Sequence, residues 1–175
     1  MRRTPFLAAL LLSLLAPLAW ADRLYQVEVI VFRQAGEPLP ASQPAPDDWA
    51  ADSQSIDGFA QQPLALQGEA AKLTPANGYE VLLHKSWSQN VGINPSRVAL
   101  SNGEPQLGHY PVEGTLTLQQ NEVLNLDASF WANQFDADGL LTASEHLQQS
   151  TRLKEGTLTY LDHRSLGVLL RVSPL

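Results

Sequence analysis

The sequence predicts a mostly β or α+β protein, built on an antiparallel sheet of five to six strands with little helix and a long Pro-rich surface loop. Several segments alternate apolar and polar residues with a period of two, and short turns join neighbouring segments. There is no internal repeat and no coiled coil. The chain has 175 residues, and the part after residue 21 has the length of one ordinary domain. We therefore expect a single domain over residues 22–175.

The first 21 residues have the three parts of a secretory signal peptide. Arg2 and Arg3 precede an apolar stretch over residues 6–16, and Ala19-Trp20-Ala21 places small residues at the cut. The apolar stretch is too short to cross a bilayer of about 30 Å stably. A retained anchor or a buried core helix is the alternative. We expect cleavage after Ala21 and release into the periplasm of a Gram-negative bacterium, without membrane insertion.

Composition narrows the classes of partner. The sequence contains no cysteine, so it has neither disulfides nor the residue that bacterial lipoproteins need at their cut site. It has 11 basic and 18 acidic residues, a net charge of −7, and cleavage would remove two arginines. Phosphate backbones and anionic membrane surfaces would repel such a chain, and no basic cluster with interleaved aromatics offsets this charge. We expect no nucleic-acid partner.

The first predicted strand is Tyr25-Gln-Val-Glu-Val-Ile-Val-Phe-Arg33. Its second face becomes apolar at Ile30 and Phe32, which predicts a central strand covered on both faces. Residues 34–68 are rich in Pro, Ala and Gln, with prolines that oppose regular structure, so they are predicted to form a flexible insertion. This insertion is either disordered or a surface arm with a function. Trp49 and Phe59 are its large apolar residues, and we expect them to hold it against the body.

Further elements follow along the chain. A helical turn is predicted over 69–73 and a Gly/Asn/Pro loop over 90–111, while 157–161 fits either a strand or a short helix. Alternation and turn residues predict an antiparallel hairpin whose arms span 112–119 and 124–134. The remaining predicted strands are 79–89, 145–153 and 166–172.

No catalytic motif is present after residue 21. A nucleophile elbow, a zinc-protease helix motif and a phosphate-binding glycine loop are all missing. The histidines lack the close spacings that let two imidazoles reach one metal: His84, His109, His146 and His163. Asp162 and His163 are adjacent and point to opposite faces if extended, so they are interpreted as turn residues. We expect no enzyme activity, no metal and no cofactor.

Trp131 is the candidate ligand contact. It falls on the same strand face as Asn125, Asp127, Ser129 and Asn133, so an indole stands among short polar side chains. Sugars present apolar C–H faces ringed by hydroxyls, which suit an exposed indole flanked by Asp127 and Asn133. A second buried face or a protein contact is the alternative. Trp87, by contrast, lies on the apolar face of its strand and is interpreted as core.

Four segments, read in order, carry a family resemblance. They are Tyr25-Gln-Val-Glu-Val-Ile-Val-Phe-Arg33, Val81-Leu-Leu-His-Lys-Ser-Trp87, Val112-Glu-Gly-Thr-Leu118, and Leu158-Thr-Tyr-Leu-Asp-His163 with Gly167-Val-Leu-Leu. Together they resemble the CsiV family of periplasmic peptidoglycan-binding proteins. The resemblance implies a non-catalytic accessory of cell-wall synthesis, which binds peptidoglycan and assists a bifunctional penicillin-binding protein through its outer-membrane lipoprotein activator. It implies no residue-level binding site.

The leading hypothesis is therefore a periplasmic peptidoglycan-binding module with a role in cell-wall biogenesis and cell shape. A second hypothesis is a protein-interaction adaptor that never contacts glycan and that docks on, or adds a strand to, a lipoprotein. A third is a hydrolase or metalloprotein with dispersed ligands.

Overall fold

A computed structural model describes residues 22–34 and 44–175. The predicted signal peptide, 1–21, and residues 35–43 of the insertion lie outside this described part.

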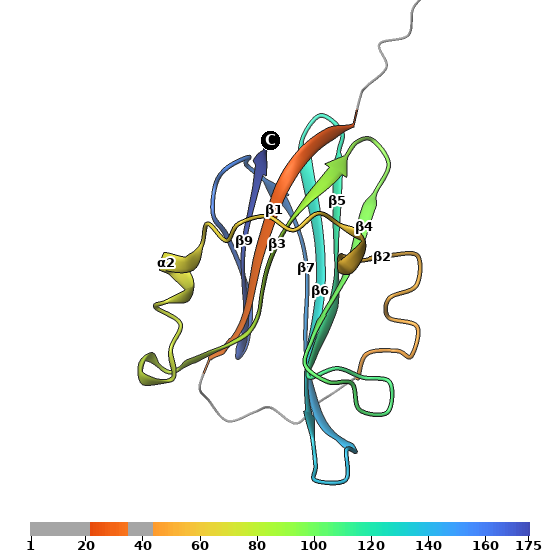
Figure 1. Ribbon diagram of the computed structural model, residues 1–175, viewed down its shortest axis with the longest axis vertical. Coiled ribbons are helices and arrows are strands. Elements are labelled where there is room, and N and C mark those ends of the chain that lie inside the picture. The colour runs from red at the N-terminus through yellow and green to blue at the C-terminus, as the bar shows by residue number, and fades with distance from the viewer. Residues whose placement is uncertain (1–21, 35–43) are drawn as a thin grey trace, which may run out of the picture.

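Nine strands in the described ranges form two sheets, shown side by side in Figure 1. Sheet A has the order β3-β1-β9-β8 and sheet B the order β2-β4-β5-β6-β7. The strands are β1 (Arg23–Gln34), β2 (Gln54–Ser55), β3 (Tyr79–Val91), β4 (Ser96–Asn102), β5 (Val112–Gln120), β6 (Leu124–Phe135), β7 (Leu141–Leu153), β8 (Thr159–His163) and β9 (Leu166–Pro174). The predicted class, mostly β with little helix, is confirmed.

In sheet A, β1 is a central strand, as the sequence predicts. It pairs antiparallel with β3 on one side and with β9 on the other. Ile30 and Phe32 on its second face are 0% and 4% exposed, because Leu66 of the insertion and the residues that follow it, Ala70 and Leu73, pack over this face. Segment 157–161, left open between strand and helix, contributes to β8 at the edge of this sheet.

Sheet B contains the predicted hairpin. β5 and β6 pair antiparallel from Val112↔Ala132 to Gln120↔Leu124. The expectation of one loop over 90–111 is wrong, since β4 lies inside it and pairs antiparallel with β5. β4 is only seven residues long and is flanked by Pro95 and Gly103, so turn residues obscured its alternation. The sequence predicted one sheet of five to six strands, whereas the described strands form one sheet of four and one of five.

The core lies between the sheets. Inward-facing side chains of β1, β3 and β9 meet those of β4, β5 and β6 in one hydrophobic cluster. Trp87 and Tyr25 of sheet A and Phe130 of sheet B are its largest members that are 0% exposed. Burial of one large apolar side chain stabilises a fold by about 1.5–3 kcal/mol. Trp87 is a core residue, as predicted.

Residues 44–78, here called the strap, run from one sheet to the other. The strap begins beside sheet B, where the Arg97 Nη2 atom lies 3.5 Å from the Trp49 carbonyl oxygen, and β2 then pairs with β4. Phe59 packs against the main core, and the amide nitrogen of Ser88 in β3 donates to the Ala60 carbonyl at 2.8 Å. Helix α2 (Gln67–Ala70) then lies outside sheet A (Figure 1). Regular structure thus occurs within 44–68, where the prolines predicted none.

A buried carboxylate attaches the strap to sheet A. Glu28 of β1 is 1% exposed and accepts hydrogen bonds from the backbone nitrogens of Ala65 and Leu66 at 2.9 and 2.8 Å. The Nε2 atom of His84 lies 2.8 Å from the same carboxylate, and Arg171 lies 4.0 Å away. These contacts hold Leu66, which is 0% exposed, over the second face of β1.

Candidate functional site

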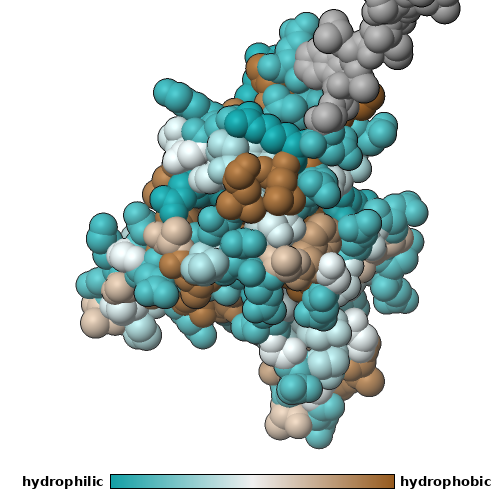
Figure 2. Space-filling view, turned by 45° about the horizontal axis from the view of Figure 1, so that its top comes forward, coloured by the Kyte–Doolittle hydropathy of each residue, from teal (hydrophilic) through white to brown (hydrophobic). Residues whose placement is uncertain are grey.

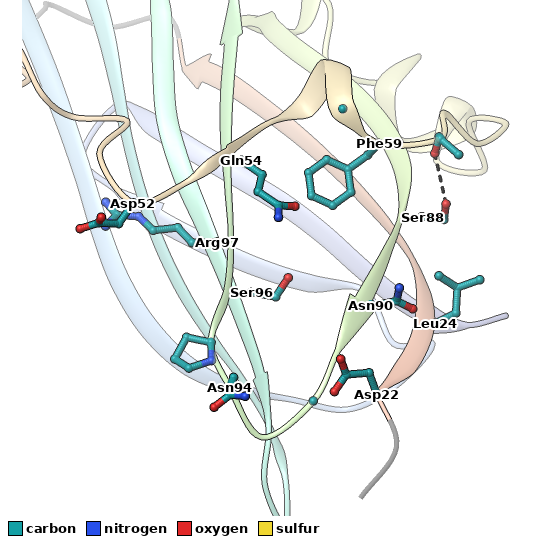
Figure 3. Close-up of a pocket in the computed structure, with 14 residues that line it drawn as sticks. Asp22, Leu24, Asp52, Gln54, Phe59, Ser88, Asn90, Asn94, Ser96 and Arg97 are labelled. Atoms are coloured by element: carbon teal, nitrogen blue, oxygen red, sulfur yellow. Dashed lines mark hydrogen bonds between the residues drawn. The ribbon is translucent and has the colours of Figure 1, made fainter.

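A polar cleft of about 540 Å³ opens where the edges of the two sheets diverge (Figure 3). One wall is the far end of β3, the other is β4, and the strap passes over one side. It is lined by Asp22, Leu24, Asp52, Gln54, Gly58, Phe59, Ala60, Ser88, Asn90, Gly92, Asn94, Pro95, Ser96 and Arg97.

The lining of the cleft combines one aromatic ring with hydrogen-bonding groups. In Figure 3 the side chains of Gln54, Phe59 and Ser96 lie between the ribbons of β3 and β4. Asn90 and Asn94 are exposed and supply amides, each with two donors and one acceptor oxygen. Phe59 is half-buried, so one part of its ring packs on the core and the rest faces outward.

A buried hydrogen-bond chain leads from the core to Ser96 in the lining of the cleft. The Trp87 indole donates to the Gln89 side-chain oxygen at 2.9 Å, and the Gln89 amide nitrogen donates to both the carbonyl and the hydroxyl oxygen of Ser96 at 2.9 Å. Gln89 is 1% exposed. Because β3 belongs to sheet A and Ser96 to sheet B, this chain sets the spacing of the two walls.

The turn at the closed end of the cleft is also held in place. The carbonyl of Gly92 accepts a hydrogen bond from the backbone nitrogen of Gln120 at 2.7 Å. The carbonyl of Ile93 accepts one from the side-chain amide of Gln119 at 2.8 Å. A side chain at position 92 would overlap the Asp22 carboxylate, which is exposed and would have to turn away. The cleft is thus bounded by ordered backbone on this side.

A second, smaller groove of about 240 Å³ lies on the outer face of sheet B. Strand pairing places Arg97, Thr117, Asp127 and Ser150 in one row across four strands. The groove is lined by Arg97, Thr115, Thr117, Asp127, Ala128, Ser129, Gln148 and Ser150. Arg97 lines both this groove and the cleft, so the two hollows meet at one guanidinium.

The three residues predicted to bind ligand do not form one exposed site. They share a strand face, as predicted, but Asp127 and Asn133 are six residues apart, roughly 20 Å along an extended strand. Asp127 is exposed in the groove, whereas Asn133 is 6% exposed and donates to the Tyr110 carbonyl and the Glu113 carboxylate at 2.8 and 2.9 Å. The ligand contact assigned to them stays a prediction.

The expectation that the Trp131 ring is exposed is wrong. Its side chain is 9% exposed, and its ring stacks on the His146 imidazole with centroids 4.2 Å apart and planes at 4°. His146 occupies the paired position on β7, and its Nε2 atom lies 2.9 Å from the Ser129 hydroxyl. Burial lowers the pKa of His146, and the charge of His163 lowers it further. The imidazole of His146 therefore covers the indole.

Sequence reasoning missed the exposed aromatic of sheet A. Tyr160 on β8 is 47% exposed, and its ring stacks on Phe32 at 6.2 Å between centroids. Phe32 in turn lies over Gly167, where a side chain would overlap the ring. The sequence offered one signal for a strand here, the alternation of Leu158 and Tyr160. The segment is too short for this alternation to exclude a helix.

The described ranges show little else that carries chemistry. Within residues 22–34 and 44–175, no three His, Asp or Glu side chains gather in a way that would hold a metal ion. No helix in this part of the chain is long and apolar enough to cross a bilayer. On the face shown in Figure 2, hydrophobic residues form small patches separated by polar ones.

Two sheets around one core, with an open polar cleft between their edges, define a β-rich binding module. The chain belongs to the CsiV family: the model of the peptidoglycan-binding protein CsiV matches residues 52–175. This match confirms the resemblance seen in the sequence, and it includes every cleft residue except Asp22 and Leu24. The family is one of peptidoglycan-binding proteins and not a known enzyme family, and it suggests a periplasmic location. No curated protein and no solved structure matches the chain significantly.

Proposed function

We propose that this protein is a non-catalytic periplasmic accessory of cell-wall synthesis that binds peptidoglycan in the cleft between its sheets. The observation that supports this function most directly is the cleft itself, in which a partly exposed aromatic ring faces a wall of amides and hydroxyls. The family match supports peptidoglycan as the class of ligand.

The chemistry of the cleft fits an amino-sugar strand. Peptidoglycan glycan presents hydroxyl and N-acetyl groups around apolar C–H faces. Asn90, Asn94 and Gln54 can donate to and accept from these groups, and the ring of Phe59 offers a surface for a sugar face. A volume of about 540 Å³ is in the range of sites that hold small ligands, so the cleft suits one to two sugar rings.

A sacculus pull-down tests this proposal. The mature protein should co-sediment with purified sacculi, and Asn90→Tyr should reduce retention because it fills the cleft from an exposed position on β3. Gln149→Tyr is the matched control, since Gln149 is an exposed amide on β7 that lines neither hollow. Wild-type protein that stays wholly in the supernatant across salt concentrations would reject direct glycan binding. Equal retention of Asn90→Tyr would reject the cleft.

We further propose the partnership that the resemblance implies, in which the protein assists a bifunctional penicillin-binding protein through its outer-membrane lipoprotein activator. Crosslinking in intact cells, followed by identification of the captured protein, tests this. Recovery of the activator is the expected result. Its absence from all crosslinked products, with other cell-wall enzymes recovered, would reject the partnership.

The adaptor hypothesis is favoured by one observation. Short strand β8 is one of the two edges of sheet A among the described strands. Leu158 just before it is 40% exposed and Tyr160 within it is 47% exposed. An edge strand with exposed apolar side chains can pair with a strand of another protein. A deletion within the Pro-rich insertion, residues 40–62, would not separate the adaptor from the glycan-binding hypothesis, because it also removes β2 and Phe59, which pack on the body. Tyr160→Ser removes the half-exposed ring from β8 and keeps every strand; lost partner capture by the folded variant, with sacculus retention unchanged, would favour the adaptor.

A further inference from the structure

We infer that Arg97 binds a carboxylate of the peptidoglycan, at the point where the cleft and the groove on sheet B meet. This inference rests on the proposed function and assigns the charged part of the ligand to one residue. It begins with the position of Arg97, the residue common to the linings of both hollows.

The half-buried arginines differ in their partners. Arg33 lies 3.7 Å from the Glu145 carboxylate and Arg171 lies 4.0 Å from that of Glu28. For Arg97, which is also half-buried, no carboxylate of residues 22–34 or 44–175 lies within the 4.0 Å of an ion pair. A guanidinium taken partly out of water is destabilising unless an anion or several acceptors compensate it.

The hydrogen bonds of Arg97 do not provide that compensation. Its Nη2 atom has two long contacts, 3.5 Å to the Trp49 carbonyl and 3.4 Å to the Thr115 hydroxyl. Its Nε atom is buried without an acceptor, and no hydrogen bond from Nη1 is formed within the described part of the chain. Nη1 therefore lacks an acceptor, and together with Nη2, whose two contacts are long, it forms an edge of the planar fork that matches a carboxylate in a bidentate pair.

The charge around Arg97 disfavours a free anion and favours a carboxylate that the rest of a bound ligand holds in place. Asp52 lines the cleft and Asp127 lines the groove, and each is exposed on its own side of Arg97. These acids repel free anions in a protein whose net charge is already −7. A carboxylate attached to a glycan seated in the cleft is held at Arg97 by the rest of the ligand.

Peptidoglycan offers two carboxylates of this kind. One belongs to the peptides attached to the glycan, and the other is the lactyl carboxylate of the muramic sugar, which is free only after the peptide is removed. Three ligands separate these sources: intact sacculi, glycan strands released by an amidase and fixed to beads, and chitin, an amino-sugar polymer without carboxylates. The full mature protein is sedimented with each.

Wild-type protein should bind sacculi more tightly than chitin, and Arg97→Met should weaken binding to sacculi by roughly tenfold, as loss of a charge-assisted pair does. Binding to chitin should not change. Arg97→Lys should lose less binding to sacculi than Arg97→Met, because lysine keeps the positive charge but lacks the planar guanidinium fork. Arg152→Met is the matched control, since Arg152 is exposed on β7 outside both hollows. Loss of binding on amidase treatment assigns the peptide carboxylate. Retained binding that Arg97→Met weakens shows that the freed lactyl carboxylate can take its place.

Two results would overturn the assignment while leaving the proposed function intact. One is equal binding of wild type and Arg97→Met to sacculi. The other is an equal loss on sacculi and on chitin, which would mean that Arg97 only shapes the cleft. The wild-type preference for sacculi over chitin needs no variant, so absence of that preference also counts against the carboxylate. Failure of wild type to bind any sacculus preparation rejects the proposed function itself.

Discussion

Gln89 joins the two sheets by donating both protons of its amide nitrogen to Ser96, one to the carbonyl oxygen and one to the hydroxyl, each at 2.9 Å. Gln89 is buried on β3, and Ser96 begins β4 at the rim of the cleft. A single buried side chain therefore links core stability to the shape of the candidate site.

Gln89→Leu should lower the free energy of unfolding by about 1–3 kcal/mol, because it leaves the indole nitrogen of Trp87 buried without an acceptor. It should also weaken sacculus binding, since the two walls lose their link. Denaturant unfolding and the pull-down check these effects. Gln149→Leu, on the exposed edge strand, is the control and should change neither; an equally stable Gln89→Leu would show that the chain of bonds is dispensable.

Glu28→Gln should loosen the strap on sheet A. The carboxylate accepts from the amides of Ala65 and Leu66 and contacts His84, and an amide has one acceptor oxygen and turns two protons toward these partners. We expect a loss of about 3 kcal/mol, typical of breaking a buried ionic contact. Hydrogen exchange at the Leu66 amide should accelerate first. Glu122→Gln, at an exposed turn, should leave that exchange unchanged, and a slow Leu66 amide in Glu28→Gln would contradict this account.

Stability should fall in mild acid because of His146. Its pKa is lowered by burial and by the charge of His163, so in the folded protein the imidazole stays neutral at pH values where the unfolded chain already binds a proton. Protons then favour unfolding. The loss should begin near the ordinary imidazole pKa of about 6.5 and continue downward until the folded imidazole also titrates.

Unfolding measured from about pH 7.5 to about pH 5 should show this loss in wild type, spanning the ordinary imidazole pKa. His146→Gln should flatten the curve, and His163→Gln should flatten it less because it removes only the smaller cause. A His146→Gln curve parallel to that of wild type would rule out His146 as the group responsible.

Trp131→Phe tests the ligand contact predicted from the sequence. The indole is 9% exposed against His146, so we expect sacculus retention to stay at the wild-type level. Trp131→Ala should instead lose about 3–5 kcal/mol of stability, as truncation of a large buried aromatic does. Reduced retention by a well-folded Trp131→Phe would restore Trp131 as a glycan contact.

Local pattern predicted much of the fold because it reports directly on which side chains share a strand face. The alternation around Ile30 and Phe32 predicted a central strand, and Gln120-Asn121 between two alternating runs predicted the hairpin of β5 and β6. β4 was missed because seven residues between Pro95 and Gly103 carry too little pattern to stand out from a loop. Pairing with β5, a non-local interaction, is what makes this segment a strand.

By itself the sequence determined the β class, the central position of β1 and the family resemblance, since these depend on period, turn residues and ordered motifs. It also placed Trp131 correctly beside Asp127 and Asn133 on one face. Only the tertiary structure decided what covers that face and where a cleft opens. A period of two fixes the direction of a side chain, whereas its burial depends on segments far away in the chain: His146 covers Trp131, and the strap brings Phe59 to Asn90.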